Sequence, residues 1–183
     1  MSRRRARPAP QLRCISARPA GATHPTPAQV ATVQATWCSL VDSDDAAARR
    51  DNVASVGVSV FHNLFAAVPH AVDLFAFEDP AKGGAIDAVM LRKHAGLAFG
   101  AVDSLIANLA DAPATAATLA GVARGHLRFG VAEAHYSMLL AAIVRTLSAA
   151  LGRRWTAEAQ SAWAALAATI TAAVAGVYAA TWA

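Results

Sequence analysis

Apolar residues along this chain recur at steps of three and four positions, which is the spacing that keeps one face of an α-helix inward. No run of β-branched residues alternates with polar residues over the length of a strand, and alanine dominates the composition. The pattern therefore predicts an all-α fold of six to eight helices. The clearest apolar stripes cover residues 27–40, 53–68, 86–109, 119–126, 139–151 and 156–177.

Proline and glycine mark the ends of these stripes. Pro27 opens the first helix, and Pro69 ends the second. The stretch that follows, through Pro80 and two glycines, predicts an irregular turn region. Pro113 separates the third stripe from the fourth, and Gly130 can take the positive backbone angle that stops a helix. The third and fourth stripes are therefore expected to fold back as two separate helices.

Two histidines lie in these stripes. His94 stands between Met90 and Leu97, so we expect its side chain to point at the core, and His126 lies near the end of the short fourth helix. One histidine on an apolar face is usually a satisfied core residue. Two on consecutive helices favour a flat metal cofactor held between them, because imidazole binds iron and a haem needs apolar walls.

The two cysteines, Cys14 and Cys38, show neither CxxC nor CxxCH spacing. The absence of these motifs excludes a zinc ribbon and a covalently attached haem. Any haem would therefore be held without a covalent bond. Two cysteines also provide no disulfide framework, which suits a reducing compartment.

Length and charge divide the chain into two parts. With 183 residues and 56% hydrophobic content, the chain can form one domain, which we place at residues 26–183. Residues 1–25 contain six arginines and no acid and are expected to be disordered, as a solvated basic tail or as a mitochondrial or plastid transit peptide. Without a cleaved transit peptide we expect a cytoplasmic protein. The remainder is mildly acidic, so no nucleic-acid partner is expected.

The last 25 residues, 159–183, carry no charge and are long enough to span a membrane. Their strongly apolar members form a single stripe that includes Trp163, Leu166 and Val174, while alanine, threonine and glycine occupy the other faces. We therefore expect an amphipathic helix that packs on the core and makes no contact with a membrane. A membrane anchor is the alternative.

The chain resembles the globin family over roughly residues 26–180. Phe61-x-x-Leu64-Phe65-x-x-x-Pro69 is similar to the second helix of globins, and Leu74-Phe75 follows as in that family. His94 and His126 then come in the expected order. Further similar segments follow the second histidine: Gly130-Val131, His135-Tyr136, Leu151-Gly152-x-x-Trp155-Thr156-x-Glu158 and Ala162-Trp163. Single-domain neuroglobin-like, plant and algal globins, with three-over-three helix packing, are the most similar in pattern.

The resemblance implies a haem b site with His126 as the proximal iron ligand and His94 as the distal residue, able to act as a sixth ligand. It implies that Phe75 stacks on the haem and that the pocket is lined by Phe61, Ala98, Val122, Val131, Tyr136 and Leu139. Partners for the haem propionates are not fixed by the pattern, but Arg128 is favoured over the other cations that flank the histidines, namely Arg92, Lys93 and Arg124.

The resemblance further implies reversible binding of dioxygen or nitric oxide, for transport or sensing, with carbon monoxide as another ligand. Phe61 stands where oxygen-scavenging bacterial relatives often carry tyrosine, which argues against very tight oxygen retention. Nitric oxide dioxygenase activity is an alternative that requires a separate reductase, because the chain contains no flavin- or nicotinamide-binding GxGxxG. A haem-free helical sensor or interaction domain is the other alternative, and a homodimer is compatible with the sequence.

Overall fold

The computed structural model describes residues 24–75, 78–79 and 85–181. Its elements confirm the predicted all-α class, and the six predicted stripes each become one helix. A short 3₁₀ helix, η1, and a two-residue hairpin occupy the predicted turn region, and a second 3₁₀ turn, η3, precedes the last helix. The elements are α1 (Pro27–Val41), α2 (Ala46–Ala67), η1 (Pro69–Leu74), β1 (Glu78–Asp79), β2 (Ala85–Ile86), α3 (Ala88–Ala107), α4 (Ala112–Leu127), α5 (Glu133–Leu151), η3 (Gly152–Arg154) and α6 (Ala157–Thr181).

Short polar side chains and glycines fix the helix ends. Asp87 accepts hydrogen bonds from two backbone amides at the start of α3, and Asp111 accepts one at the start of α4. These caps satisfy amides that have no partner inside the helix. At the other ends, Gly130 and Gly152 have φ angles of 71° and 52°, the left-handed backbone conformation that glycine adopts without strain. The predicted stop after α4 is therefore confirmed.

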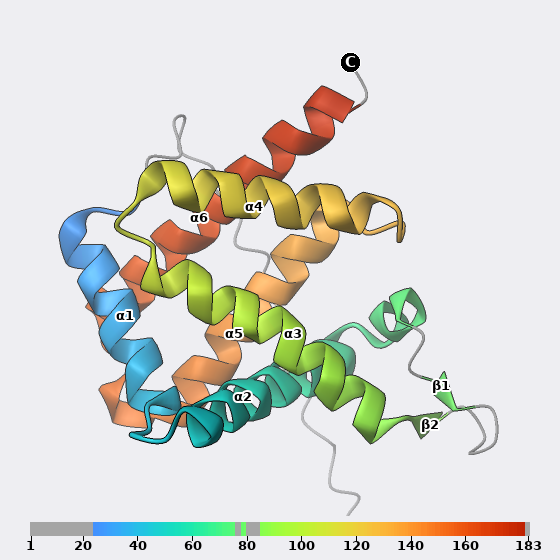
Figure 1. Ribbon diagram of the computed structural model, residues 1–183, viewed down its shortest axis with the longest axis horizontal. Coiled ribbons are helices and arrows are strands. Elements are labelled where there is room, and N and C mark those ends of the chain that lie inside the picture. The colour runs from blue at the N-terminus through green and yellow to red at the C-terminus, as the bar shows by residue number, and fades with distance from the viewer. Residues whose placement is uncertain (1–23, 76–77, 80–84, 182–183) are drawn as a thin grey trace, which may run out of the picture.

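The six α-helices form two layers (Figure 1). α3 crosses in front of α2, α4 lies above α3, and α5 and α6 pass behind them, with α1 at the left. α2 packs on α3 and α5, and α6 packs on α1, α4 and α5. The main core lies where these helices meet and includes Trp37, Val60, Phe99 and Leu147, each at most 1% exposed.

The crossing of α2 and α3 depends on Gly57. A Cβ atom at this position would lie 2.6 Å from Cδ2 of Phe99 and 3.1 Å from the Ala95 carbonyl oxygen. The absent side chain therefore allows the Phe99 ring to lie directly against the α2 backbone. Phe61, one turn later on α2, and Ala95 on α3 are both buried by the same crossing.

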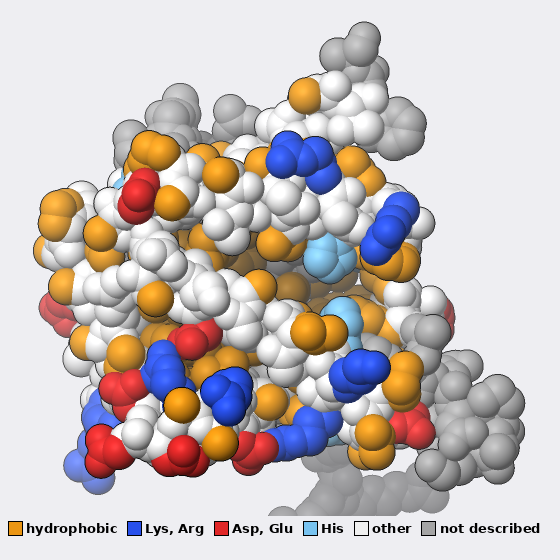
Figure 2. All heavy atoms as spheres, viewed as in Figure 1, with side chains coloured by type: hydrophobic (Ala, Val, Ile, Leu, Met, Phe, Trp, Pro, Cys, Tyr) orange, Lys and Arg blue, Asp and Glu red, His pale blue; other side chains and the backbone are white. Residues whose placement is uncertain are grey.

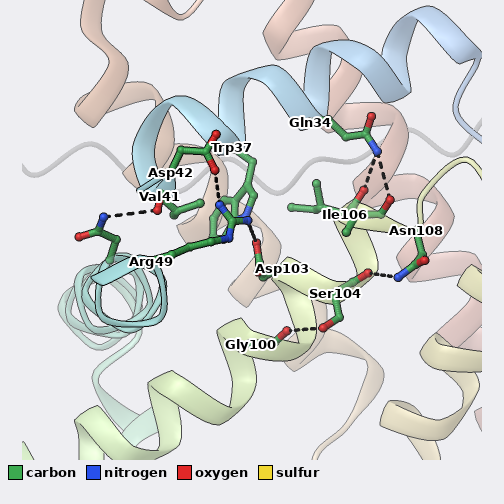
Figure 3. A network of polar contacts seen from close by, with 12 residues as sticks. Gln34, Trp37, Val41, Asp42, Arg49, Gly100, Asp103, Ser104, Ile106 and Asn108 are labelled. Carbon is green, nitrogen blue, oxygen red and sulfur yellow. Dashed lines mark hydrogen bonds and ion pairs between the residues drawn. The ribbon is translucent and has the colours of Figure 1, made fainter. Parts of the chain in front are cut away.

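A polar network ties the first three helices together on the other side of this crossing (Figure 3). The indole nitrogen of Trp37 donates to Asp103 at 2.7 Å, and the guanidinium of Arg49 pairs with the same carboxylate oxygen at 2.6 Å. Arg49 also pairs with Asp42. Because Trp37 is on α1, Arg49 on α2 and Asp103 on α3, the network fixes how these helices meet at one end.

The inward face of α3 differs from the prediction. Met90 and Leu97 were expected to be buried, but they are 45% and 70% exposed. The buried face instead carries Leu91, Ala95 and Phe99. In a helix this rich in apolar residues two neighbouring stripes are equally plausible from sequence, and the contact with Gly57 selects the second. His94 consequently lies at the edge of the buried face and is half-buried, with its ring packed against Phe61 of the core and against Phe75.

The predicted basic extension falls almost entirely outside the described residues, and its disorder stays a prediction. The described chain begins slightly before the predicted domain boundary, where Nε2 of His24 lies 2.6 Å from the Leu109 carbonyl oxygen and Pro25 is buried. Residues 77, 80, 83 and 84 of the predicted turn region also lie outside the described part of the chain.

Two helical stretches, Glu133–Arg154 and Ala157–Thr181, are long and apolar enough to cross a membrane by length and composition. Core helices of globular proteins meet the same criterion, so this is weak evidence for a membrane span. The packing of α6 on α1, α4 and α5 agrees with the predicted amphipathic core helix.

The crossing can be tested with two glycine substitutions. Gly57→Ala should lower the free energy of unfolding by about 1–3 kcal/mol, because the new methyl group overlaps the Phe99 ring and the Ala95 carbonyl. The matched control is Gly100→Ala on α3, where an added Cβ meets nothing within 4 Å. The free energy of unfolding of this control should rise by up to about 1 kcal/mol, because alanine has a higher helix propensity than glycine. Urea unfolding of both variants measures the difference, and equal stabilities would contradict the steric role of Gly57.

Candidate functional site

The buried hydrophobic residues of the described chain form two clusters, and a histidine lies at the edge of each. The main core includes Phe61, and Phe75 packs against it. The second cluster is defined by Ala123, Tyr136 and Val174, with Val122, Val131, Ile170, Val177 and Tyr178 packed against it. In Figure 2 two histidine side chains, one over α3 and one over α4, flank a hollow. α3 and α4 contain one histidine each, His94 and His126, and these two lie close enough for His126 to affect the pKa of His94.

On the α3 side, aromatic rings surround His94. The centroid of its imidazole lies 5.3 Å from the centroid of Phe61 and 5.1 Å from that of Phe75, both in edge-to-face geometry. The two phenylalanine rings lie 5.5 Å apart, also edge-to-face. Edge-to-face contacts of this kind fix ring orientation in a dry environment. Phe61, on α2, and Phe75, which follows η1, thus hold the imidazole of His94 from two directions.

The same environment changes the protonation of His94. Burial lowers the pKa of His94 below its ordinary value, and the neighbouring charge of His126 lowers that pKa further. The imidazole is therefore neutral at pH 7. A neutral imidazole has a lone pair with which it can bind a metal, and it also retains one N–H donor.

On the α4 side, the backbone orients His126. Its Nδ1 lies 2.8 Å from the carbonyl oxygen of Val122, one turn earlier in the helix. Because a carbonyl only accepts hydrogen bonds, Nδ1 carries the proton, and Nε2 is then the nitrogen that bears the lone pair. A hydrogen bond from the second ring nitrogen to a carbonyl is the usual device that fixes the tautomer of a metal-binding histidine.

Aromatic residues of α5 and α6 support this side of the site. The Tyr136 ring meets His126 edge-to-face at 6.0 Å and Tyr178 at 6.4 Å. The Tyr178 hydroxyl donates to the Val131 carbonyl and so ties α6 to the turn before α5. No described group is in hydrogen-bonding geometry with the buried Tyr136 hydroxyl. Burial and the nearby Tyr178 raise the pKa of Tyr136, so the phenol stays neutral.

Most of the predicted site residues belong to the two hydrophobic clusters or pack against them. Phe61, Phe75, Ala98 and Leu139 belong to the main core or pack against it, and Val122, Val131 and Tyr136 belong to the second cluster. The outlying member of the predicted set is Arg128, which is exposed and places its guanidinium 4.7 Å from the centroid of the Phe129 ring.

Among the other cations considered for this site, Arg92 pairs with Asp51 on α2. This ion pair holds the Arg92 guanidinium at the surface between α2 and α3. Lys93 and Arg124 are exposed. Figure 2 shows basic side chains around the hollow on the same face.

Sequence reasoning missed two residues that support the site. Phe65 lies 5.9 Å from Phe61 and 5.6 Å from Phe75 and completes the aromatic group beside His94. Tyr178 supports Val131 and Tyr136 on the opposite side. The position of Tyr178 one turn after Val174 was the available signal, but only the packing of α6 beside α4 shows what its hydroxyl reaches.

The arrangement fits a flat, apolar metal cofactor. It offers one imidazole whose tautomer is fixed by the backbone, a second neutral imidazole on the neighbouring helix, and a separate apolar cluster behind each. Such a group inserted between the clusters would be covered on both faces by hydrophobic side chains, as cofactor sites usually are.

A comparison with protein families agrees with this geometry. A family model described as Globin matches residues 58–174, which is more than half of the chain. The matched region begins in α2, ends in α6, and includes both histidines and both phenylalanines that contact His94.

The lowered pKa of His94 predicts how stability depends on pH. In the unfolded chain this histidine titrates near its ordinary value of 6.5, and in the folded chain it titrates lower. The unfolded state therefore binds a proton first as the pH falls. The contribution of His94 to the free energy of unfolding is fully present above pH 6.5. It decreases as the pH falls below that value, and it stops decreasing below the pKa that His94 has in the folded chain.

Urea unfolding of the haem-free chain across this pH range measures the effect. His94→Gln should remove the part of the acid-induced loss that His94 contributes, whereas His62→Gln, at an exposed position of α2, should keep it. Parallel stability curves for wild type and His94→Gln would contradict the prediction.

Proposed function

This chain belongs to the globin family, and we propose that it binds haem b non-covalently between α3 and α4 and reversibly binds a diatomic gas, dioxygen or nitric oxide. Carbon monoxide would bind in the same way. When bound, the haem supplies an iron centre with affinity for small diatomic molecules. The protein then has to hold the group, exclude water from it and control access to one face.

The observation that carries this proposal is the hydrogen bond from His126 Nδ1 to the Val122 carbonyl at 2.8 Å. It directs the basic Nε2 of His126 outward from α4 and makes His126 the fixed ligand. The bond also raises the basicity of the imidazole, because the carbonyl draws on the proton at Nδ1. Tyr136 packs its ring against the same imidazole and limits its rotation.

On the other face, His94 is the polar group among apolar neighbours. Phe61, Phe75 and Ala98 would exclude water from this side, since none of them offers a side-chain hydrogen bond. His94 is the group that would donate to a bound gas molecule. A single donor in an otherwise apolar pocket suits reversible binding, because a ligand held by one hydrogen bond can leave.

We further propose that His94 would hold the iron as a second protein ligand when no gas is present. Its neutral state at pH 7 provides the lone pair that a metal requires. Phe61 and Phe75 hold the ring at the edge of α3 that faces the hollow. With His94 in this role, an incoming gas would have to displace it, which would favour sensing or electron transfer over storage.

For the cofactor's propionate groups we propose Arg128 as the partner, with Lys93 as the corresponding cation on α3. Both side chains are exposed, Lys93 on α3 and Arg128 directly after the last residue of α4. Arg128 would bind a carboxylate with its planar guanidinium, which matches carboxylate geometry. No contact among the described residues favours nitric oxide dioxygenation, so that activity and its separate reductase stay predictions of the sequence.

Visible absorption spectra of the purified chain with haem supplied test the function. Wild type, reduced without oxygen, should show an intense Soret band and the sharp, split visible bands of two axial histidines. His94→Leu should give the single broad band of an iron held by one histidine. His126→Leu should weaken haem retention strongly, because it removes the fixed ligand.

His62→Leu is the matched control, since this exposed histidine of α2 lies outside the site. It should leave the wild-type spectrum unchanged. Absence of a Soret band in the wild-type protein would contradict haem binding. A His94→Leu spectrum identical to wild type would contradict only the role of His94 as a second ligand.

A further inference from the structure

A second concave region lies away from the histidines, between α4 and α6. It is an open groove of about 450 Å³, which is within the range of small-molecule sites. α6 crosses behind α4 and its C-terminal end continues past it (Figure 1), and the residues of α6 that line the groove all belong to its C-terminal half. The groove is lined by Ala116, Arg124, Ala173, Gly176, Val177, Ala180 and Thr181.

The walls of this groove are small and apolar. Alanine, glycine and valine make up most of the lining, so an extended hydrocarbon chain could lie close to both helix backbones. An added Cβ at Gly176 would meet nothing within 4 Å, which shows the space above this position. The Thr181 hydroxyl already donates to the Val177 carbonyl. The threonine therefore adds little polarity to the groove.

One cation lies in this apolar setting. Arg124 is exposed, and the ion pairs within the described part of the chain involve Arg49 and Arg92 instead. α4 contains no acidic residue, and α6 contains none after Glu158 in its first turn. A guanidinium that forms no ion pair with the described residues, beside a hydrocarbon-like wall, is complementary to a molecule with one carboxylate and a long apolar tail.

We propose that the α4–α6 groove binds one molecule of a long-chain monocarboxylate, a fatty acid. Its carboxylate pairs with Arg124, and its alkyl chain lies along Ala173, Gly176 and Val177. A second copy of this chain fits less well, because neither α4 nor the facing part of α6 could offer an acid to Arg124. The site does not involve His94 or His126, so it stands independently of the proposed gas binding.

The groove nevertheless borders the second cluster. Val177 lines the groove and also packs with Tyr136 and Val174. Arg124 precedes His126 by two residues on α4. The ligand would thus occupy the outer surface of the cluster whose inner surface supports His126.

The test is calorimetric titration of the full chain with oleate, kept below the concentration at which it forms micelles. We expect one oleate per chain. Arg124→Gln should weaken binding about tenfold or more, the equivalent of losing one charge-assisted contact. Gly176→Leu should weaken it at least as much, because Gly176 lines the groove, has open space above its Cβ position and would project the new side chain into the volume of the ligand.

Two controls separate the groove from general effects. Gly121→Leu introduces the same side chain on α4, where an added Cβ also meets nothing within 4 Å but outside the groove lining. Arg145→Gln removes an exposed arginine from α5. Both controls should retain wild-type affinity, and circular dichroism should show the same helix content in all four variants.

Several results would overturn the proposal. No oleate binding, or binding weakened equally by the groove variants and the controls, would show that the groove is not the site. Binding to phosphatidylglycerol vesicles but not to monomeric oleate would make it a membrane contact. A wild-type dimer in sedimentation that Gly176→Leu dissociates would make it an interface between two copies.

Discussion

The close approach of α2 and α3 at Gly57 is the constraint on which the rest of the structure depends. Without a side chain at this position, the Phe99 ring lies against the backbone of α2, and the two helices cross at a distance that no larger residue permits. That crossing decides which face of α3 is buried. It places Phe61 beside His94 and leaves His94 at the boundary between core and hollow. A site needs a histidine that is oriented by packing but not enclosed by it, and this crossing produces one.

On the opposite side of the site, other interactions orient the histidine. α4 is short, ends at Leu127 before the turn that contains Gly130, and is oriented through its contact with α6. Here the imidazole of His126 is set by a hydrogen bond within its own helix and by the Tyr136 ring. Because the second cluster is separate from the main core, the two halves can sit on either side of a flat group while each keeps its own packing.

α4 has two roles in this arrangement. Its inner face carries His126 and Val122, and its outer face, with Arg124, forms one wall of the groove beside α6. The apolar residues of α6 face both regions through Val174 and Val177. A helix with small residues on most of its faces can serve two neighbours in this way, because alanine and glycine leave space that larger side chains would fill.

The sequence alone determined the all-α class, the six helices with most of their ends, and the two candidate histidines, because proline, glycine and the 3.6-residue period act locally. The resemblance of particular segments to globins added the phenylalanines around His94. Only the tertiary structure decided that α3 buries Leu91, Ala95 and Phe99 rather than Met90 and Leu97, since both stripes have helical spacing and the choice depends on a partner helix. Only the tertiary structure showed that the Tyr178 hydroxyl donates a hydrogen bond to the Val131 carbonyl. The groove between α4 and α6, lined mostly by alanine, glycine and valine, was likewise visible only there. Such features arise from side chains far apart in sequence, and no local pattern encodes which of them will meet.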